Sequence, residues 1–527
     1  MGTVCRPGSL PGALLLGAAL LNFCVLSTAR GAGVTVITHG FNGNAQGWVL
    51  GMAGNIPGYH RFPGTNVICY EVSVSNNGAF TVTSRKLAGG HPTNDFNAEM
   101  VIKLDWGDLA GFFDQYDTYE VAAAVVPRLL QTNFIAELSG HALAELPLHL
   151  IGHSRGGSLV CQLSRLLGTN GVWVDHVTTL DPHPVNEDGN TDPLLVSDAP
   201  LRIYENVLFA DNCYQDFGGY PHGQFMPSSY NRRLTALPGG YSSAHSDTHL
   251  WYHATIDLSN PADDSEAILT AGDRAAWFSP YETSGVRAGF HYSRLGGGDR
   301  LSLDRPVNSD SDYPAYGYNQ RWNFGAGVAA NRTLLPANNG NWPNLIRFNL
   351  AGTNLMAQGQ SNAVTFYYQW AKPATSNATA SIYVDDDYNP WNGNERLVRQ
   401  LTAAGTTSNN VGSTIVSINV AATNTAPGVH SLFAKISDSG RTRYLYAPEL
   451  LTVFSSLEPP RLAIVRDAGS QIRVDVTGVP GQRIVLQSTT DYHTWQPLVT
   501  NWLATNRWSY FTNSVGSGTK YYRAELR

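Results

Sequence analysis

The chain has 527 residues, of which 43% are hydrophobic and only 14% charged, a composition typical of a folded protein. Its formal net charge is −7 at pH 7 and the sequence has no basic cluster, which argues against nucleic acid as a partner. A chain of this length is expected to form several domains rather than one hydrophobic core.

The N-terminal segment has the pattern of a secretory signal peptide over residues 1–31. An apolar stretch at 13–29 follows Arg6, and Ser27 and Ala29 supply the small residues that a cleavage site needs. A retained membrane anchor is the alternative, because the apolar run is only slightly shorter than a bilayer span. We expect cleavage, which gives a secreted, periplasmic or cell-surface protein without an integral membrane span.

Cysteine usage argues against a disulfide scaffold, despite the export signal. Without the N-terminal segment the chain retains Cys69, Cys161 and Cys213, which allow at most one internal disulfide. The fold must therefore be held together by its hydrophobic core.

Residues from about 33 to 335 alternate between short apolar stretches and amphipathic helical stretches. Strands are expected at 34–38, 66–74, 100–106, 148–151 and 172–180, and helices at 116–133 and 155–167. This alternation predicts an α/β domain with a mainly parallel central sheet over 32–337.

The pattern changes after about residue 340, where apolar and polar residues alternate and no helical period of useful length remains. We expect a β-sandwich module over 343–455 and a smaller β module over 459–527. The predicted strands lie at 364–370, 414–420, 430–436, 472–476, 484–486 and 521–526. A glycan or a surface is the candidate ligand of these two all-β modules.

The motif most informative about function is Gly-His-Ser-Arg-Gly at 152–156, which has the G-x-S-x-G spacing. It follows an apolar strand and opens an amphipathic helix, which is the setting of a nucleophile elbow. Glycine is needed on both sides because the tight strand-to-helix turn leaves no room for side chains. Ser154 is expected at the tip of this turn with its hydroxyl exposed, and an ordinary glycine-rich helix start is the alternative.

A serine hydroxyl needs a base, and the base needs a group that orients it. Asp181 ends the next apolar strand and should lie at the same edge of the sheet, in the sequence order Ser, acid, His of this fold class. We expect His245 to be the base, with His249 as the alternative. A metal site formed by His245, Asp247, His249 and His253 is a weaker alternative, because this spacing matches no usual zinc pattern.

Two backbone N–H groups are expected to stabilise the oxyanion of the reaction. One belongs to Phe41, which follows a strand ending in His39-Gly40, and the other to Arg155, the residue after the serine. A simple turn is the alternative interpretation of His39-Gly40.

Candidate pocket residues lie beside the serine and between the acid and the base. These are His153, Phe217, Phe225 and Met226, and a surface loop with incidental aromatic residues is the alternative for the last three.

The reaction itself requires no cofactor, but the β-sandwich module has a candidate structural calcium site. Asp385, Asp387 and Asn389 offer the hard oxygen ligands that calcium prefers. Their spacing is not that of an EF-hand loop, so a plain acidic β-turn is the favoured alternative.

Together, in this order, the motifs resemble those of the pancreatic-type lipase family of α/β-hydrolases. The matching segments are T-H-G-F at 38–41, K-L-D-W-G at 103–107, I-G-H-S-R-G-G at 151–157, T-L-D-P-H-P at 179–184 and H-S-D-T-H-L-W-Y at 245–252. The likeness covers residues 34–256 and implies an α/β-hydrolase fold. It also implies a serine esterase that acts on a lipid-like ester through Ser154, Asp181 and His245.

The chain also departs from the pattern of this family. Arg155 and Gly157 differ from its usual residues after the serine, and the cysteines that commonly bracket its lid are missing. These departures leave lipase, esterase, polyester hydrolase and peptidase open. A degenerate hydrolase acting as an exported polymer- or surface-binding protein is the alternative from another class. The last module is similar to small C-terminal β domains of exported bacterial proteins.

Overall fold

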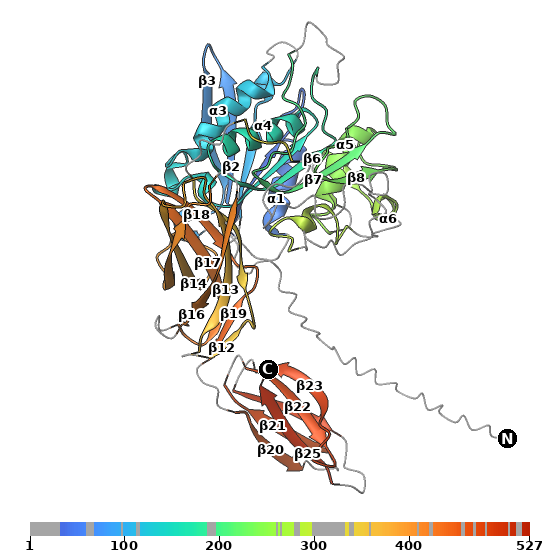
Figure 1. Cartoon of the computed structure of the whole chain (residues 1–527). Helices are drawn as coiled ribbons and strands as arrows, with labels where there is room; N and C mark the ends of the chain where they lie inside the picture. The colour runs from blue at the N-terminus through green and yellow to red at the C-terminus, as the bar shows by residue number, and fades with distance from the viewer. Residues whose placement is uncertain are drawn as a thin grey trace, which may run out of the picture.

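The computed structural model describes residues 32–58, 68–95, 99–111, 116–186, 196–259, 262–263, 266–278, 285–297, 332–336, 342–357, 360–407, 410–420, 425–454, 459–466, 471–479, 482–503, 506–512 and 519–526. The signal peptide expected at 1–31 lies outside the described residues. The architecture is a large mixed sheet with helices on both faces, followed by two β units (Figure 1).

The large sheet has eight strands in the order β3-β2-β4-β1-β5-β6-β7-β8. Neighbouring strands pair in parallel except β2 and β3, which form an antiparallel pair at one edge. The strands are β1 Gly33–Thr38, β2 Ile68–Asn76, β3 Phe80–Ala88, β4 Glu99–Asp105, β5 Leu148–His153, β6 Val174–Leu180, β7 Val207–Gln215 and β8 Tyr230–Leu234. The five predicted strands correspond to β1, β2, β4, β5 and β6, whereas β3, β7 and β8 were not predicted.

Helices and short strands complete this part of the chain. The helices are α1 Trp48–Asn55, α2 Pro92–Asp95, α3 Thr118–Leu130, α4 Arg155–Thr169, α5 Ala244–His253 and α6 Ala271–Phe278. The 3-10 turns are η1 Ile56–Gly58, η2 Gly107–Leu109, η3 Ala136–Leu138, η4 Leu143–Glu145 and η5 Gly289–Tyr292. The strands β9 Ala262–Asp263 and β10 Ile268–Leu269 form a separate pair. The predicted helices correspond to α3 and α4.

Two apolar cores lie on the two faces of the large sheet. Successive side chains of a strand point to opposite faces, so Val36 of β1 joins the core under α3 and α4, and Ile37 joins the core under α1 and α5. Figure 1 shows the same division, with α3 and α4 together on one side of the sheet and α1, α5 and α6 on the other. The carboxyl ends of the parallel strands are thereby held rigidly at one edge.

A buried carboxyl group at the start of β4 makes stability depend on pH. Glu99 is buried and accepts a hydrogen bond from Thr35 Oγ1 at 2.7 Å. Burial, assisted by the nearby Asp175, raises the pKa of Glu99 to about 8. The folded protein therefore keeps a proton that the unfolded chain releases from about pH 4.5 upward.

The variant Glu99→Gln tests this dependence. Because the wild-type carboxyl has a raised pKa, the free energy of unfolding should fall as the pH rises from about 4.5 to 8, by an amount on the order of a few kcal/mol. Glutamine does not ionise, so the free energy of unfolding of the variant should not show the decrease with pH that Glu99 causes. The variant should therefore be more stable than wild type at pH 8. Denaturant unfolding at a series of pH values measures both curves, and parallel curves would contradict the prediction.

The first β unit is a sandwich of two sheets, one of order β11-β13-β16 and one of order β12-β19-β17-β14-β15 with β18 paired to β17. Its core takes side chains from both sheets, such as Phe366 and Ile382. The strands are β11 Asn344–Leu350, β12 Leu355–Ala357, β13 Asn362–Gln369, β14 Asn377–Asp385, β15 Arg396–Ala404, β16 Val411–Ile418, β17 Gly428–Asp438, β18 Arg441–Tyr446 and β19 Leu451–Phe454. They include the three stretches predicted in this region.

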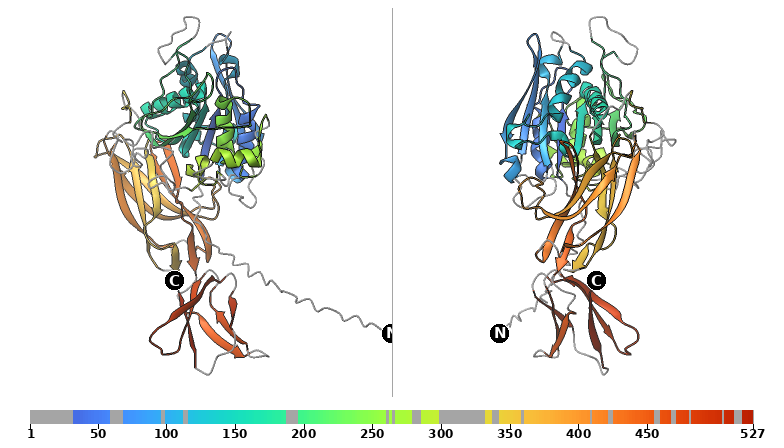
Figure 2. Two further views of the ribbon diagram at one scale, coloured as in Figure 1. Left: turned by 90° about the vertical axis from the view of Figure 1, so that its right-hand side faces the viewer. Right: turned by 60° about the vertical axis from the view of Figure 1, so that its left-hand side comes forward.

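The second β unit is smaller and also has two sheets, β20-β21-β24 and β23-β22-β25, around a core that includes Val474 and Leu486. The strands are β20 Arg461–Arg466, β21 Ile472–Thr477, β22 Arg483–Thr489, β23 Gln496–Trp502, β24 Arg507–Thr512 and β25 Tyr521–Leu526. Both views in Figure 2 place this unit beyond the sandwich, on the side away from the large sheet.

The sandwich packs against the amino-terminal ends of the central strands. Asn344 accepts a hydrogen bond from Trp173 N at 2.9 Å, and Arg443 donates to Trp173 O at 3.0 Å, just before β6. Trp391 stacks on His141 with ring centroids 4.9 Å apart, in the segment before β5. Tyr444 and other aromatic residues of the sandwich belong to the same apolar core as α3 and α4. The carboxyl ends of β5 and β6 therefore remain on the far side from this contact.

Two further observations bear on the sequence predictions. Cys69, Cys161 and Cys213 are all buried and free of disulfides. Within the described residues, no helix combines the length and apolarity that a bilayer crossing would require.

Candidate active site

Ser154 lies in a sharp turn between β5 and α4. Its backbone is left-handed, with φ 56° and ψ −127°, which a non-glycine residue adopts only where the surrounding structure enforces it. A Cβ on Gly152 would lie 2.1 Å from Gly156 O, and one on Gly156 would lie 2.5 Å from His39 O. Glycine is therefore required at both positions, as the sequence predicts. Ser154 as a whole residue is buried, with 7% of its surface exposed, and Gly40 packs against it.

Asp181 follows β6 and is fully buried, yet each of its carboxylate oxygens accepts two hydrogen bonds. Oδ1 accepts from Gln215 N at 2.8 Å and from Gly223 N at 3.0 Å. Oδ2 accepts from Gln215 Nε2 at 2.9 Å and from His245 Nδ1 at 2.6 Å. Four donors hold the carboxylate in one orientation, with one oxygen directed at the histidine.

The structure brings Ser154, Asp181 and His245 to one edge of the sheet. Ser154 N donates to Leu180 O at 2.9 Å, so the serine stands beside the residue that precedes the aspartate. His245 is the second residue of α5, and its Nδ1–H donates to Asp181, which leaves Nε2 as the basic nitrogen of the neutral ring. No hydrogen bond joins Ser154 Oγ to His245 in the described structure. Such bonds often tighten only when substrate binds.

His153 precedes the serine and fixes the main chain at His245. Its Nε2 donates to the carbonyl oxygen of His245 at 2.9 Å, and the two ring centroids are 4.5 Å apart. Burial lowers the pKa of His153 well below its usual range, so the ring is neutral at pH 7. A neutral ring can donate here without adding a positive charge beside His245.

His249, the alternative base, occupies a different environment. It stacks on Trp48 with ring centroids 4.3 Å apart and makes an edge contact with His153 at 4.8 Å. Burial lowers the pKa of His249 well below its usual range. Asp181 Oδ2 accepts its histidine hydrogen bond from His245, so the geometry favours His245 as the base over His249.

The segment that suggested a metal site is helical, and its polar side chains face separate partners. Asp247 accepts from Tyr241 N at 2.6 Å, and His253 Nε2 lies 2.8 Å from Asn55 Nδ2. Over the described parts of the chain, no group of three or more histidine, cysteine or acidic side chains is arranged to hold a metal ion.

The turn after β1 packs directly on the serine. A Cβ on Gly40 would lie 2.6 Å from Ser154 Cβ and 3.0 Å from its Oγ, so only glycine fits. The Gly40 carbonyl accepts from Gly43 N at 3.1 Å and lies 2.9 Å from His39 Nδ1. In a trans peptide the N–H points opposite to the C=O, so the Phe41 N–H points away from the His39 ring.

The variant Gly40→Ala should lower kcat for an ester substrate by about 100-fold or more, because the added methyl group must push the turn and its N–H away from the serine. Steady-state kinetics on a soluble ester measures this change. Gly54→Ala is the matched control, because a Cβ at Gly54 of α1 meets nothing within 4 Å. Equal activity of the two variants would show that the turn tolerates a side chain.

The four predicted pocket residues occupy different positions. His153 is buried beside His245, Phe217 is 47% exposed and Phe225 is partly exposed. Met226 is fully buried, where its Sδ accepts a hydrogen bond from Thr179 Oγ1 at 3.0 Å. The structure therefore places Met226 in the core rather than on an open surface.

A contact that the sequence did not predict joins the segment after β7 to the site. His183 N donates to Ser154 O at 3.1 Å, and the His183 ring lies 3.0 Å from Tyr220 Oη and 6.5 Å, between centroids, from the His245 ring. Tyr220 is 79% exposed. No sequence pattern relates residues so far apart. The donors Gln215 and Gly223 could have been sought at the end of the next strand and in the segment after it.

The candidate calcium ligands are engaged in hydrogen bonds within the protein, two of them inside the turn and one from strand β18. Asp385 Oδ2 accepts from Tyr446 Oη at 2.6 Å, and Asp387 Oδ2 accepts from Asn392 Nδ2 at 2.8 Å. Asn389 N donates to Asp387 Oδ1 at 2.7 Å. Burial raises the pKa of Asp385 to about 8, so at pH 7 this group is largely protonated without a cation. Calcium binding stays a prediction.

Comparisons with known proteins leave the family open. Neither a family model nor a curated protein matches the chain. Solved structures that match include the CARDB domain of a Pyrococcus furiosus protein, with 8% identity over 22% of this chain and 97% of that one, at a TM-score of 0.15. The C-terminal domain of Wzt has 10% identity over 22% and 76% of the two chains, with a TM-score of 0.17. The human OSCAR ligand-binding domain has 14% identity over 34% and 87%, with a TM-score of 0.18. Scores this low carry no argument about fold or function.

Proposed function

We propose that this protein is a serine hydrolase that cleaves carboxylic esters through Ser154, His245 and Asp181. One observation carries the proposal. Asp181 holds His245 by a 2.6 Å bond beside a serine whose left-handed turn places it at the same sheet edge. A buried acid that fixes the tautomer of a histidine next to a strained serine is the arrangement that nucleophilic acyl transfer needs.

The proposal includes an α/β-hydrolase fold for the region 32–337. The run of parallel strands, the serine turn between β5 and α4, and the acid at the end of β6 support it. The sequence resemblance to the pancreatic-type lipase family supports the same assignment. The domain limits and a secreted location after cleavage at about residue 31 belong to this proposal.

The proposed reaction proceeds in two halves. Ser154 Oγ attacks the acyl carbon as His245 Nε2 takes its proton, and the carbonyl electron pair moves to oxygen. The N–H groups of Phe41 and Arg155 stabilise this oxyanion. The Arg155 N–H is suited to this role because Arg155 is the first residue of α4, where helix N–H groups have no partner within the helix. The oxyanion collapses, His245 returns the proton to the leaving alcohol, and water then releases the acid from the acyl-enzyme by the same steps.

An apolar acyl group is the substrate class that we favour. The exposed side chains of Phe217 and Tyr220 belong to the segment that contacts Asp181 and His183, and they offer apolar surface beside the site. Comparison of soluble short-chain esters with emulsified long-chain esters tests this preference. Faster turnover of the long-chain esters at an interface would support a lipid-like substrate.

Covalent labelling tests the proposed function. A fluorophosphonate probe should label the purified mature protein, and mass spectrometry should place the adduct on Ser154. A short-chain ester added in excess should slow the labelling. A correctly folded protein that remains unlabelled would contradict the proposal and favour an exported binding protein instead.

A further inference from the structure

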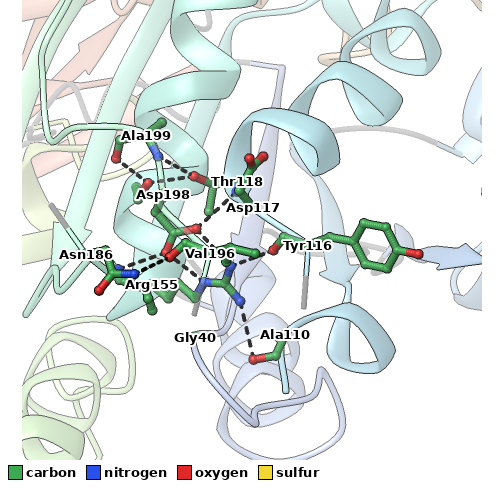
Figure 3. A network of polar contacts seen from close by, with 12 residues as sticks. Gly40, Ala110, Tyr116, Asp117, Thr118, Arg155, Asn186, Val196, Asp198 and Ala199 are labelled. Atoms are coloured by element: carbon green, nitrogen blue, oxygen red, sulfur yellow. Dashed lines mark hydrogen bonds and ion pairs between the residues drawn. The ribbon is translucent and has the colours of Figure 1, made fainter. Parts of the chain in front are cut away.

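The side chain of Arg155 forms a buried ion pair with Asp198 next to the serine turn (Figure 3). Nε donates to Oδ2 at 2.7 Å and Nη2 donates to Oδ1 at 2.9 Å. The exposed fractions of the two side chains are 1% and 0%. Because desolvation of two charges offsets most of their attraction, such a pair is weak evidence for stability alone. The contacts that surround it indicate a role in positioning.

The guanidinium group of Arg155 reaches the segment that follows β4. Nη2 donates to Tyr116 O at 2.5 Å, and Nη1 donates to Ala110 O at 3.4 Å. Ala110 O also accepts from Asn42 N at 3.3 Å, and Asn42 follows Phe41 directly. A single carbonyl group thus connects the Arg155 side chain to the turn that carries the proposed oxyanion donor. Figure 3 draws Arg155, Tyr116 and Ala110 in one view.

Trp106 provides a second connection to the same turn. The Arg155 guanidinium carbon lies 4.9 Å from the centroid of the Trp106 ring. The indole Nε1 donates to Thr38 Oγ1 at 3.1 Å and to His39 O at 3.3 Å. The guanidinium is therefore stacked on a side chain that is itself bonded to the end of β1.

Asp198 connects the pair to the segment that carries the acid. Its Oδ2 accepts from Val185 N at 3.0 Å, and its Oδ1 accepts from Thr118 N at 3.1 Å. Val185 belongs to the segment that begins at Asp181, in which His183 N donates to Ser154 O at 3.1 Å. The carboxylate thus ties the first turn of α3 and the segment after β6 to the guanidinium.

We propose that the Arg155–Asp198 ion pair positions the oxyanion site. It holds the turn of residues 39–42 at the distance from Ser154 at which the Phe41 N–H can donate a hydrogen bond to the oxyanion. The inference rests on the proposed function. Lysine cannot replace the arginine, because an ammonium group lacks the planar set of donors that reaches Asp198, Tyr116 O and Ala110 O together.

The test compares Arg155→Met and Arg155→Lys with a matched control, Arg294→Met. Arg294 pairs with the buried Asp175 at the opposite, amino-terminal end of β6. Both Arg155 variants should lower kcat for a soluble ester by about 100-fold while KM changes less than about threefold, because the loss concerns the transition state. The control should lose stability and keep its kcat.

Hydrogen exchange gives a readout that does not depend on activity. Amides of residues 38–43 and 106–110 should exchange at least about tenfold faster in both Arg155 variants, and at the wild-type rate in Arg294→Met. Wild-type kcat in folded Arg155→Met, or unchanged exchange in these segments, would overturn the positioning role. Failure of the proposed function has a different signature, in which the wild type itself neither turns over esters nor reacts with the probe.

Discussion

Replacement of Ser154 by alanine is expected to lower ester turnover by roughly four to six orders of magnitude, because no other group can form the acyl-enzyme. The fold should survive, since the side chain of this residue makes no hydrogen bond within the described structure and only a hydroxyl group is removed. Hydrolysis of a soluble ester by purified protein measures the loss, and circular dichroism and the melting temperature establish that the variant is folded.

Ser164→Ala is the matched control for this variant. Ser164 lies in helix α4, more than two turns beyond Ser154. It is fully buried and donates to Cys161 O at 2.7 Å. It should retain wild-type turnover. Ester hydrolysis by Ser154→Ala at more than about 1% of the wild-type rate would remove the serine from the proposed mechanism.

The second large effect is expected from Asp181→Asn, which should lower kcat by roughly three to four orders of magnitude. An asparagine retains the shape and can still accept from Gln215 N and Gly223 N, but it loses the charge that fixes the His245 tautomer. The imidazolium formed during the reaction also loses its counter-charge. Steady-state kinetics near neutral pH measures the fall.

Another buried acid–histidine pair supplies the control for this prediction. Asp211 Oδ1 lies 2.8 Å from His176 Nε2 within strands β6 and β7. Asp211→Asn should lower the melting temperature and leave kcat within a few-fold of wild type. If Asp181→Asn behaved in the same way as Asp211→Asn, Asp181 would be a structural residue only.

The serine turn and its two partners could be predicted because local sequence determines their placement. Glycine at 152 and 156 is demanded by close backbone contact, and the ends of parallel strands necessarily share an edge, which brings Asp181 to Ser154. His245 was identifiable from its place before the apolar stretch that begins at Leu250, although the structure includes it in the first turn of α5. Its preference over His249 is supported by the contact with Asp181.

Other parts of the site depend on contacts between distant segments, for which the sequence has no pattern. Asp198 meets Arg155 because two segments after different strands converge, and nothing near either residue marks the pairing. The strand β3 was missed because it lies at the edge of the sheet, which tolerates polar residues, and Val82 is the only one of its residues that is buried. Met226 was predicted as a pocket residue from its apolar character, which is equally suited to the core in which it lies.

The contact between the sandwich and the large sheet limits where the chain can be shortened. Trp391, Tyr444 and Arg443 cover apolar and backbone groups next to His141 and Trp173, so a fragment that stops before β11 would expose this surface to water. Such a fragment is a poor choice for expression, since an uncovered apolar patch promotes aggregation. A fragment that retains β11–β19 and omits only the last unit preserves the interface.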